Sequence, residues 1–570
     1  MRTSKSLFSL STLSLKSSIF TLISFPVSLY SIFNRLLTKE GSNVFVKGLF
    51  CLLVFSPTPT NAQEQQPQAP DLNPTLKIGV VQHFGDKPTD QLILKAQPGD
   101  YLTLQFQTLQ GNKQLQTESV LLKMGFEPLP EPEVEERVVL STHRSYENAE
   151  EDAQKWRSLG LEVELAQPDR WQVWAKRSVY NTPLLRRWLI DSLQAQGHKL
   201  PRLETQVLTQ KRTPYWTAAG YRYNRNQLEI TSPQNVIQVS QKTNDPEPLV
   251  YGGSLRLQPD AYGTYTLVNN VPLETYLRGV VPHEIGAWPP AASIEAQAIL
   301  ARTYALRNLQ RFEADNYHLC ANTDCQVYKG LTEVYSTTDQ AIEVTKGLAL
   351  THNNNLTEAV YFSSSGGVTA NYNDIWNGEP RPYLQGVIDS PNKIWDLSQQ
   401  NLASEPNFRK FINLKTGFNE TGELDFRWRG EATLEGIAVQ LRSYLKRRNL
   451  PQANFKKVQK VEIVKRSPTG RVLKMIVTTD QGMLEIAKDE IQSAFLPPIS
   501  TLFYIDPVYN PNKTLKGYVF VGGGFGHGVG MSQTGSYHLA KLGWSSEQIL
   551  NFYFPGTQLQ PLNPSMLSGN

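Results

Sequence analysis

The sequence predicts a multidomain α+β protein. The chain has 570 residues, more than the roughly 100–200 residues of an ordinary domain. Hydrophobic residues make up 40% of it and charged residues 19%, a composition that supports packed cores and excludes a chain disordered throughout. Short runs typical of strands and longer runs with helical periodicity alternate along the chain, so both kinds of element are expected in several units.

The first 62 residues have the pattern of an export signal. Lys47 precedes a short apolar core, residues 48–55, and the small residues after it end at Ala62, where cleavage is expected. The core is too short to span a bilayer. An earlier apolar stretch, residues 17–33, leaves three alternatives: a leader that is removed, a membrane anchor, or an unstructured tail. Export or anchoring predicts an extracytoplasmic location, in the periplasm or cell wall.

Outside this leader the chain is almost neutral. Residues 1–62 hold six Lys or Arg and one acidic residue, which leaves 50 basic and 51 acidic residues in the remainder. This balance argues against a nucleic-acid partner. The 8 His and 3 Cys of the whole chain exclude a disulfide scaffold and an array of zinc fingers.

The first half of the exported part predicts a linker and two small units. Residues 63–75, rich in Gln and Pro, form the linker. Apolar runs separated by turns predict a small β-rich unit over residues 76–130. Residues 128–136 are rich in Pro and Glu and predict a hinge before the next unit, residues 135–200.

Residues 135–200 predict the order strand, helix, strand, strand, helix. The elements are expected at residues 137–142, 148–159, 161–165, 171–175 and 183–196. This order, with the phrase Ser-Tyr-Glu-Asn-Ala-Glu at 145–150, resembles a sporulation-related repeat (SPOR), a module that binds glycan strands without peptides. The alternative is a generic α/β spacer.

The remainder, residues 205–565, begins with strands and continues with two helices separated by prolines. Pro272 suits a helix start, and residues 273–281 carry one apolar face. Pro282 is expected to end this helix, and Pro289 to open another that reaches about Phe312. Further helices are expected at residues 437–448 and 532–542.

Glu284 is the first candidate for chemistry. It lies between the two helices, with Val281, Ile285 and Trp288 as apolar neighbours. A carboxyl group in such surroundings loses solvation, so its pKa should rise, which suits a general acid at neutral pH. The alternative is an exposed glutamate or a helix cap.

His318, Cys320 and Cys325 form the second candidate. Imidazole and thiolates suit zinc, with a fourth ligand from water or from a distant side chain. The alternative is a disulfide between the two cysteines, because an exported protein meets oxidising conditions. The spacing leaves both alternatives open.

The third candidate is a run of three hydroxyls and two glycines: Ser363, Ser364, Ser365, Gly366 and Gly367. Glycines let the backbone approach a ligand. The Gly-x-Ser-x-Gly pattern of a serine hydrolase is absent, so a polar turn that lines a sugar site is expected.

The fourth candidate is the glycine-rich segment 522–533. No Gly-Lys-Ser/Thr follows its glycines, which excludes a P-loop; neither a nucleotide nor a redox cofactor is expected. His527, with glycine on both sides, and Gln533 are candidate polar contacts in a cleft. The alternative is a tight structural turn before a helix.

Four blocks in this order resemble the stage II sporulation protein D (SpoIID) family, which also includes the amidase enhancer LytB. The blocks are residues 271–284, 296–305, 363–367 and 524–533, and Tyr-Phe-Pro-Gly-Thr at 553–557 closes the last one. The resemblance implies a SpoIID-type domain over residues 205–565, with mixed α/β structure.

The resemblance also implies an enzyme of the cell wall. SpoIID-type proteins are lytic transglycosylases that cut glycan strands after N-acetylmuramic acid and prefer strands stripped of peptides by an N-acetylmuramoyl-L-alanine amidase. The family's catalytic acid falls on Glu284, and its structural zinc falls on His318, Cys320 and Cys325. A single carboxyl group suffices, because it protonates the glycosidic oxygen and then accepts a proton from the C6 hydroxyl, which closes a 1,6-anhydro ring.

Two rival functions stay open. The protein could be a non-catalytic enhancer that binds glycan and stimulates an amidase, or a structural anchor that uses the SPOR-like part. A two-carboxylate hydrolase would need a second acid, for which Asp374, Asp389 and Asp396 are available. Sporulation itself does not follow from the resemblance.

Overall fold

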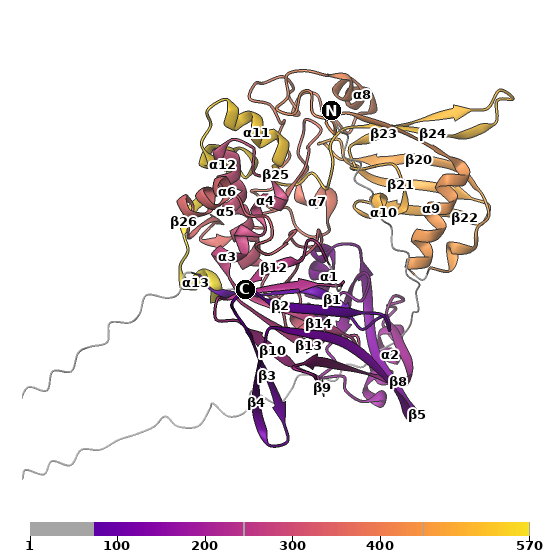
Figure 1. Cartoon of the computed structure of the whole chain (residues 1–570). Helices are drawn as coiled ribbons and strands as arrows, with labels where there is room; N and C mark the ends of the chain where they lie inside the picture. Colours follow the sequence, from indigo (N-terminus) through magenta and orange to yellow (C-terminus); the bar gives the residue numbers. More distant parts are fainter. Residues whose placement is uncertain (1–72, 243–244, 449, 569–570) are drawn as a thin grey trace, which may run out of the picture.

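The computed structural model describes residues 73–242, 245–448 and 450–568, and it has the predicted mixed α+β architecture (Figure 1). The predicted leader and most of the linker lie outside the described residues. Within the described part of the chain, no helix is both long enough and apolar enough to cross a membrane.

One large sheet combines strands from two distant parts of the chain. Its order is β15 (Leu319–Cys320), β1 (Thr75–Phe84), β14 (Tyr265–Pro272), β13 (Ser254–Pro259), β10 (Leu228–Thr231), β3 (Leu102–Thr108) and β4 (Gly111–Thr117). The strands of residues 76–130 thus share a sheet and an apolar core with strands of residues 228–272, and the expected small β-rich unit has no sheet of its own.

A second large sheet reaches from this core into the inserted segment. Its order is β12 (Leu249–Gly252), β11 (Val236–Ser240), β2 (Gln91–Ala96), β5 (Ser119–His143), β7 (Trp171–Ala175) and β6 (Val163–Ala166), with β8 (Arg202–Ala218) paired to β5 and to β9 (Tyr221–Asn224). The hinge expected at residues 128–136 is wrong: β5 runs through it, because β8 pairs with it on both sides of an irregularity between Pro128 and Glu133.

The inserted module, residues 135–200, has the predicted order of elements. β5 is followed by α1 (Tyr146–Ser158), β6, β7 and α2 (Pro183–Ala195). The apolar core of the module also takes in Phe312, Tyr317 and Cys320 from the following domain. The module is therefore packed against its neighbour and is not joined to it by a flexible linker alone. Its binding of glycan stays a prediction.

The central helix α5 (Ala291–Arg307) is buried on almost every side. Its many alanines let neighbours approach closely, and it contacts elements on several faces. These neighbours are α3 (Leu273–Arg278), α4 (Val281–Glu284), α6 (Ser336–Val344), α11 (Gln533–Lys541), α12 (Ser546–Tyr553), β16 (Leu348–His352) and β17 (Asn355–Leu356). β16 lies between β17 and β26 (Gln558–Pro561), and α13 (Pro564–Ser568) ends the described chain.

Pro282 does not end a helix, as the sequence predicted, but lies in the first turn of the next one. α3 ends at Arg278, and Pro282 lies in the first turn of α4. Proline suits a first turn because the missing N–H has no helical partner there. Pro282 thus opens the short helix that ends at Glu284. α5 ends at Arg307, before the expected Phe312.

The C-terminal part contains two three-stranded sheets and a short parallel pair. The sheets are β19 (Trp428–Thr433), β24 (Leu515–Gly522) and β23 (Phe503–Tyr509), and β20 (Val458–Arg466), β21 (Val472–Thr479) and β22 (Gly482–Ala487); β18 (Tyr361–Phe362) pairs with β25 (Met531–Ser532). The helices are α7 (Tyr372–Ile375), α8 (Glu405–Asn413), α9 (Leu434–Arg447) and α10 (Glu490–Ala494), with single 3₁₀ turns at Glu313–Asp315 and Pro451–Asn454. The helices expected at 437–448 and 532–542 are confirmed as α9 and α11.

A buried ion pair fixes α3 against α5, and its loss should be costly. Two guanidinium nitrogens of Arg302 donate to the Glu274 carboxylate, each at 2.8 Å, and Arg302 is fully buried. Arg302→Ala should lower the free energy of unfolding by about 3–5 kcal/mol, because Glu274 is left without its partner. Urea denaturation measures this. Arg256→Ala, which breaks the exposed pair with Glu229, is the control and should cost less than about 1 kcal/mol.

Candidate active site

A cavity of about 480 Å³ lies where three parts of the chain meet. Its size is within the range of pockets that hold small ligands. Its walls come from the inserted module, from the α4–α5 region and from the C-terminal part. Five of the predicted site residues line it: Glu284, Cys325, Ser363, His527 and Gln533. The structure thus brings together residues that lie almost 250 positions apart in the sequence.

Glu284 is the last residue of α4 and is partly buried in the cavity wall. Its carboxylate oxygen Oε1 accepts a hydrogen bond from the Val327 N–H at 2.6 Å. Burial raises the pKa of Glu284 to about 7, and the Val327 N–H and the nearby Tyr361 hydroxyl oppose that rise. The carboxyl group therefore exchanges its proton near neutral pH, as its apolar neighbours in the sequence predicted.

Two side chains of α11 hold the backbone beside this carboxyl group. Gln533 donates from Nε2 to the Glu284 carbonyl oxygen at 3.0 Å. Tyr537 donates from its hydroxyl to the Ile285 carbonyl oxygen at 2.9 Å. Gln533, which was expected to touch a ligand, lines the cavity and at the same time fixes the position of Glu284.

His527 lies in the wall as a neutral ring. Burial lowers the pKa of His527 to about 4. Its Nδ1 accepts the Val529 N–H at 3.1 Å, so the ring hydrogen is on Nε2. The ring lies near Phe362 and Trp376, with centroid distances of 5.4 and 5.1 Å. Both alternatives for the glycine-rich segment hold in part, since it makes a tight turn and also lines the cavity.

The serine-rich turn lies mostly behind the wall. Ser363 lines the cavity, whereas Ser364, Ser365, Gly366 and Gly367 are buried and engaged elsewhere. Glu420 accepts from the Ser364 hydroxyl at 2.8 Å and from the backbone N–H groups of Ser365 and Gly366 at 2.5 and 2.9 Å. These four residues therefore support the cavity wall from behind, and their side chains and backbone are not part of the cavity lining.

Glycine is required where this turn meets the glycine-rich segment. Gly366 and Gly524 have φ values of +68° and +81°. A Cβ at Gly366 would lie 2.5 Å from the Gly523 carbonyl carbon, and one at Gly524 would lie 2.6 Å from the Ser364 oxygen. The two glycines thus allow the two backbones to touch, which explains both motifs without a direct contact to substrate.

The sequence did not indicate the structural role of Asp389 and Glu420, the two acids that support this contact; Asp389 was considered only as a second acid for a hydrolase. Asp389 accepts from the hydroxyls of Ser365 and Tyr553, each at 2.7 Å. Burial and the nearby Glu420 raise the pKa of Asp389 to about 7. No recognisable motif surrounds either acid in the sequence, so no local signal could have indicated that they support the contact between the two segments.

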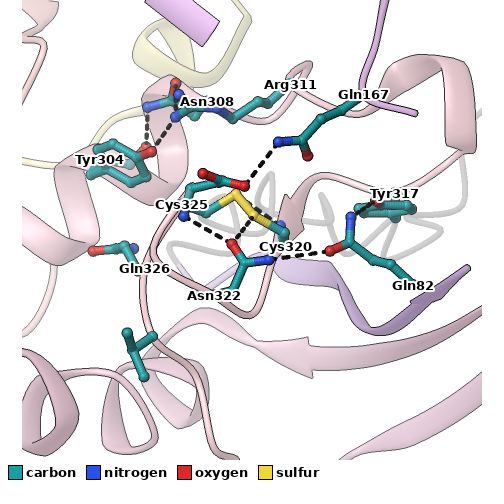
Figure 2. Close-up of a disulfide and its surroundings, with 12 residues drawn as sticks. Gln82, Gln167, Tyr304, Asn308, Arg311, Tyr317, Cys320, Asn322, Cys325 and Gln326 are labelled. Atoms are coloured by element: carbon teal, nitrogen blue, oxygen red, sulfur yellow. Dashed lines mark hydrogen bonds between the residues drawn. A yellow bond between two sulfur atoms is a disulfide. The ribbon is translucent and has the colours of Figure 1, made fainter. Parts of the chain in front are cut away.

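Cys320 and Cys325 form a disulfide, with their Cα atoms 5.7 Å apart (Figure 2). The third predicted zinc ligand, His318, accepts the Lys77 N–H at Nδ1, at 3.2 Å. No group of three or more His, Cys, Asp or Glu suited to a metal ion occurs among the described residues. This donor set does not fit zinc, because the two sulfurs are bonded to each other and are not thiolates. The disulfide alternative is the one observed.

The disulfide closes the loop that reaches Glu284. Cys325 lines the cavity, and Val327, the donor to Glu284, follows two residues later. Between them, Gln326 donates to the Tyr276 hydroxyl at 3.2 Å and accepts from the Tyr361 hydroxyl at 2.9 Å. The loop is therefore held immediately before Val327, the residue that hydrogen-bonds the candidate acid.

The inserted module supplies one wall of the cavity, which the sequence did not predict. Its contributions are Arg144, Ser145, Tyr146, Glu147 and Trp171. Arg311, which also lines the cavity, pairs with Glu147 at 2.7 Å and lies 4.1 Å from the centroid of the Tyr146 ring. Figure 2 shows Arg311 and Gln167 close to the disulfide.

The disulfide should contribute measurably to stability. The double variant Cys320→Ser, Cys325→Ser should lose about 2 kcal/mol of unfolding free energy, because a short closed loop restrains the unfolded chain. Thermal unfolding with and without dithiothreitol checks this: the reductant should destabilise the natural protein and leave the double variant unchanged. Stoichiometric zinc, with both thiols of the isolated protein reduced, would contradict the disulfide.

Comparison with known families identifies two segments. A family model described as "Stage II sporulation protein" matches residues 261–352, which include Glu284 and the disulfide. A domain of unknown function (DUF8618) matches residues 370–530, which include His527. The cavity therefore lies between the two matched segments.

Curated relatives match over about half of the chain. The amidase enhancer of Bacillus subtilis is 27% identical over 54% of this chain and 47% of its own length, so the chain spans about half of that relative. Stage II sporulation protein D of Bacillus subtilis is 27% identical over 54% of this chain and 80% of its own length. An uncharacterized protein of Brachyspira hyodysenteriae is 25% identical, over 55% and 73%. The chain thus contains a SpoIID domain and is distantly homologous, over about half its length, to the amidase enhancer and to stage II sporulation protein D.

Proposed function

We propose that this protein is a lytic transglycosylase that cleaves peptidoglycan glycan strands outside the cytoplasm. The observation that carries the proposal is Glu284, a carboxyl group in a cavity wall whose pKa is raised by burial to about 7. Such a group can give up a proton and take one back at neutral pH. The homology to cell-wall proteins supports glycan as the substrate.

The proposed reaction needs one carboxyl group. Glu284 donates its proton to the glycosidic oxygen while the bond from C1 of N-acetylmuramic acid to that oxygen breaks. The C6 hydroxyl oxygen of the same sugar then bonds to C1, and its proton passes to Glu284. The product is a 1,6-anhydro end, no water is consumed, and Glu284 returns to its starting state.

The other acids support a mechanism with a single carboxyl group. Three more acids line the cavity, and each is engaged: Glu147 with Arg311, Asp324 with Gln167, and Asp489 with Ser145 and Asn148. The acids considered for a hydrolase, Asp374, Asp389 and Asp396, do not line the cavity. A second carboxylate poised to activate water is therefore not apparent among the described residues.

A second candidate function is a non-catalytic enhancer of an amidase. The similarity to the amidase enhancer of Bacillus subtilis favours it. In that case the cavity would bind glycan without cutting it, and an N-acetylmuramoyl-L-alanine amidase would be the partner. The same amidase would act before this protein if it is an enzyme, because it removes the peptides.

Digestion of peptide-stripped glycan strands separates these functions. The natural protein should release fragments with 1,6-anhydro ends, one water lighter than hydrolysis products by mass spectrometry. Glu284→Gln should lower the rate by at least about 10²-fold, because the amide cannot transfer the proton. The matched control is Glu295→Gln on α5, a half-buried glutamate that does not line the cavity.

Two other outcomes would change the proposal. Fragments that have gained a water would replace the transglycosylase by a hydrolase. No cleavage by the natural protein, with stimulation of an amidase that persists in Glu284→Gln, would establish the enhancer. Thermal unfolding at pH 8 checks the fold of the variant, which should be at least as stable as the natural protein because a desolvated charge is removed.

The pH dependence should report the same group. Glu284 must be protonated in the free enzyme, and burial raises its pKa to about 7. The value of kcat/KM on short stripped strands should therefore be flat with respect to this group below pH 7 and fall about tenfold per pH unit well above it. A falling limb near pH 4.5, the ordinary range of glutamate, would contradict this assignment.

A further inference from the structure

Arg144 places a positive charge in the cavity without a carboxylate partner. It precedes α1, is exposed, and lines the same cavity as Glu284. Its Nη1 donates to the Asp489 carbonyl oxygen at 2.7 Å and to the Gln492 side-chain oxygen at 3.2 Å. Both acceptors are neutral groups, and the Asp489 carboxylate itself interacts with Arg144 only electrostatically, without a hydrogen bond. Among the described residues, no carboxylate oxygen lies within 4 Å of the guanidinium.

The other charges of the cavity are compensated. Arg311 is buried and paired with Glu147. The Asp489 carboxylate accepts from Ser145 at 2.9 Å and from Asn148 at 3.1 Å. Asp324 accepts from Gln167 at 2.9 Å. Arg144 is thus the cavity cation that can gain most from an anionic group on a ligand.

The inserted module holds Arg144 in a fixed position relative to the opposite wall. The Asn377 N–H donates to the Asn148 side chain at 2.7 Å, and Arg381 pairs with Glu151 at 2.8 Å. Arg170 pairs with Glu490 at 2.6 Å. These contacts, with those of Arg144 itself, join the module to the C-terminal part, so the guanidinium is positioned before a ligand arrives.

We propose that Arg144 is a specificity-determining residue that binds the free lactyl carboxylate of a muramic acid without its stem peptide. This inference rests on the proposed glycan substrate. When a peptide is attached, that carboxyl group is an amide: it has no charge and carries extra bulk. A guanidinium prefers the carboxylate, because it can donate two parallel hydrogen bonds to an anion.

The inference gives the inserted module a role inside the site. The module would distinguish a free lactyl carboxylate from an amide on the sugar next to the bond that Glu284 cleaves. It would therefore do more than bind the strand away from the site. The reaction that supplies this substrate must therefore hydrolyse the amide between the lactyl group and the peptide.

The test compares two forms of one glycan. Peptide-stripped strands are used as they are, or after their lactyl carboxylates have been converted to methylamides. The full chain is assayed for cleavage, and its Glu284→Gln variant is assayed for binding of both forms. Arg144→Gln and Arg144→Lys are made in both backgrounds. Arg157→Gln, which removes an exposed arginine of α1 outside the cavity, is the matched control.

The preference for the carboxylate form is the decisive quantity. It should be about tenfold or more in the natural protein and in Arg157→Gln. It should vanish in Arg144→Gln with little change for methylamide strands, and be intermediate in Arg144→Lys. An unchanged preference in Arg144→Gln would overturn the inference, and so would an equal loss of binding and cleavage for both forms of the glycan. If Arg144→Gln does not fold, the preference measured for Arg144→Lys decides.

Binding separates this inference from the proposed function. If nothing is cleaved but binding of carboxylate strands depends on Arg144, the transglycosylase fails and the inference stands. If cleavage occurs without any preference between the two forms, the transglycosylase stands and the inference fails.

Discussion

The cavity depends on one buried carboxylate that joins two loops distant in the sequence. Glu420 accepts hydrogen bonds from Ser364, from the backbone of Gly366, and from Ser532. The first two belong to the serine-rich turn, and Ser532 belongs to the end of the glycine-rich segment, residues 522–533. A buried carboxylate needs such donors, because it has lost its water. The hydrogen bonds that satisfy Glu420 therefore hold the two loops in place. These loops belong to the part of the chain that brings His527 and Gln533 into the cavity lined by Glu284.

The environment that stabilises Glu420 contrasts with that of Glu284. Glu420 is fully buried and surrounded by donors, whereas Glu284 is partly buried with fewer of them, and its pKa rises to about 7. Glu420 therefore supports the loops behind the cavity as a hydrogen-bond acceptor, whereas Glu284 lines the cavity and carries the proton proposed for the chemistry.

The inserted module is built into the cavity and is not a separate tethered domain. A tethered glycan-binding module would raise the local concentration of a strand, but this module shares a core with the SpoIID domain and lines its cavity. The disulfide, whose Cys320 also belongs to this core, closes the loop before Val327. Docking and cross-linking both restrict the walls around Glu284, which favours a preorganised site.

Local patterns in the sequence determined much of the fold and the most reactive group. Periodicity and prolines predicted α1, α2, α9 and α11, and the apolar neighbours of Glu284 predicted its raised pKa. Only the tertiary structure decided which segments meet. It showed that residues 76–130 share a sheet with residues 228–272, that Ser364 to Gly367 lie behind the wall, and that Arg144 faces the cavity. Periodicity and desolvation by chain neighbours are short-range effects, whereas strand pairing, domain docking and the partners of a buried acid join residues hundreds of positions apart.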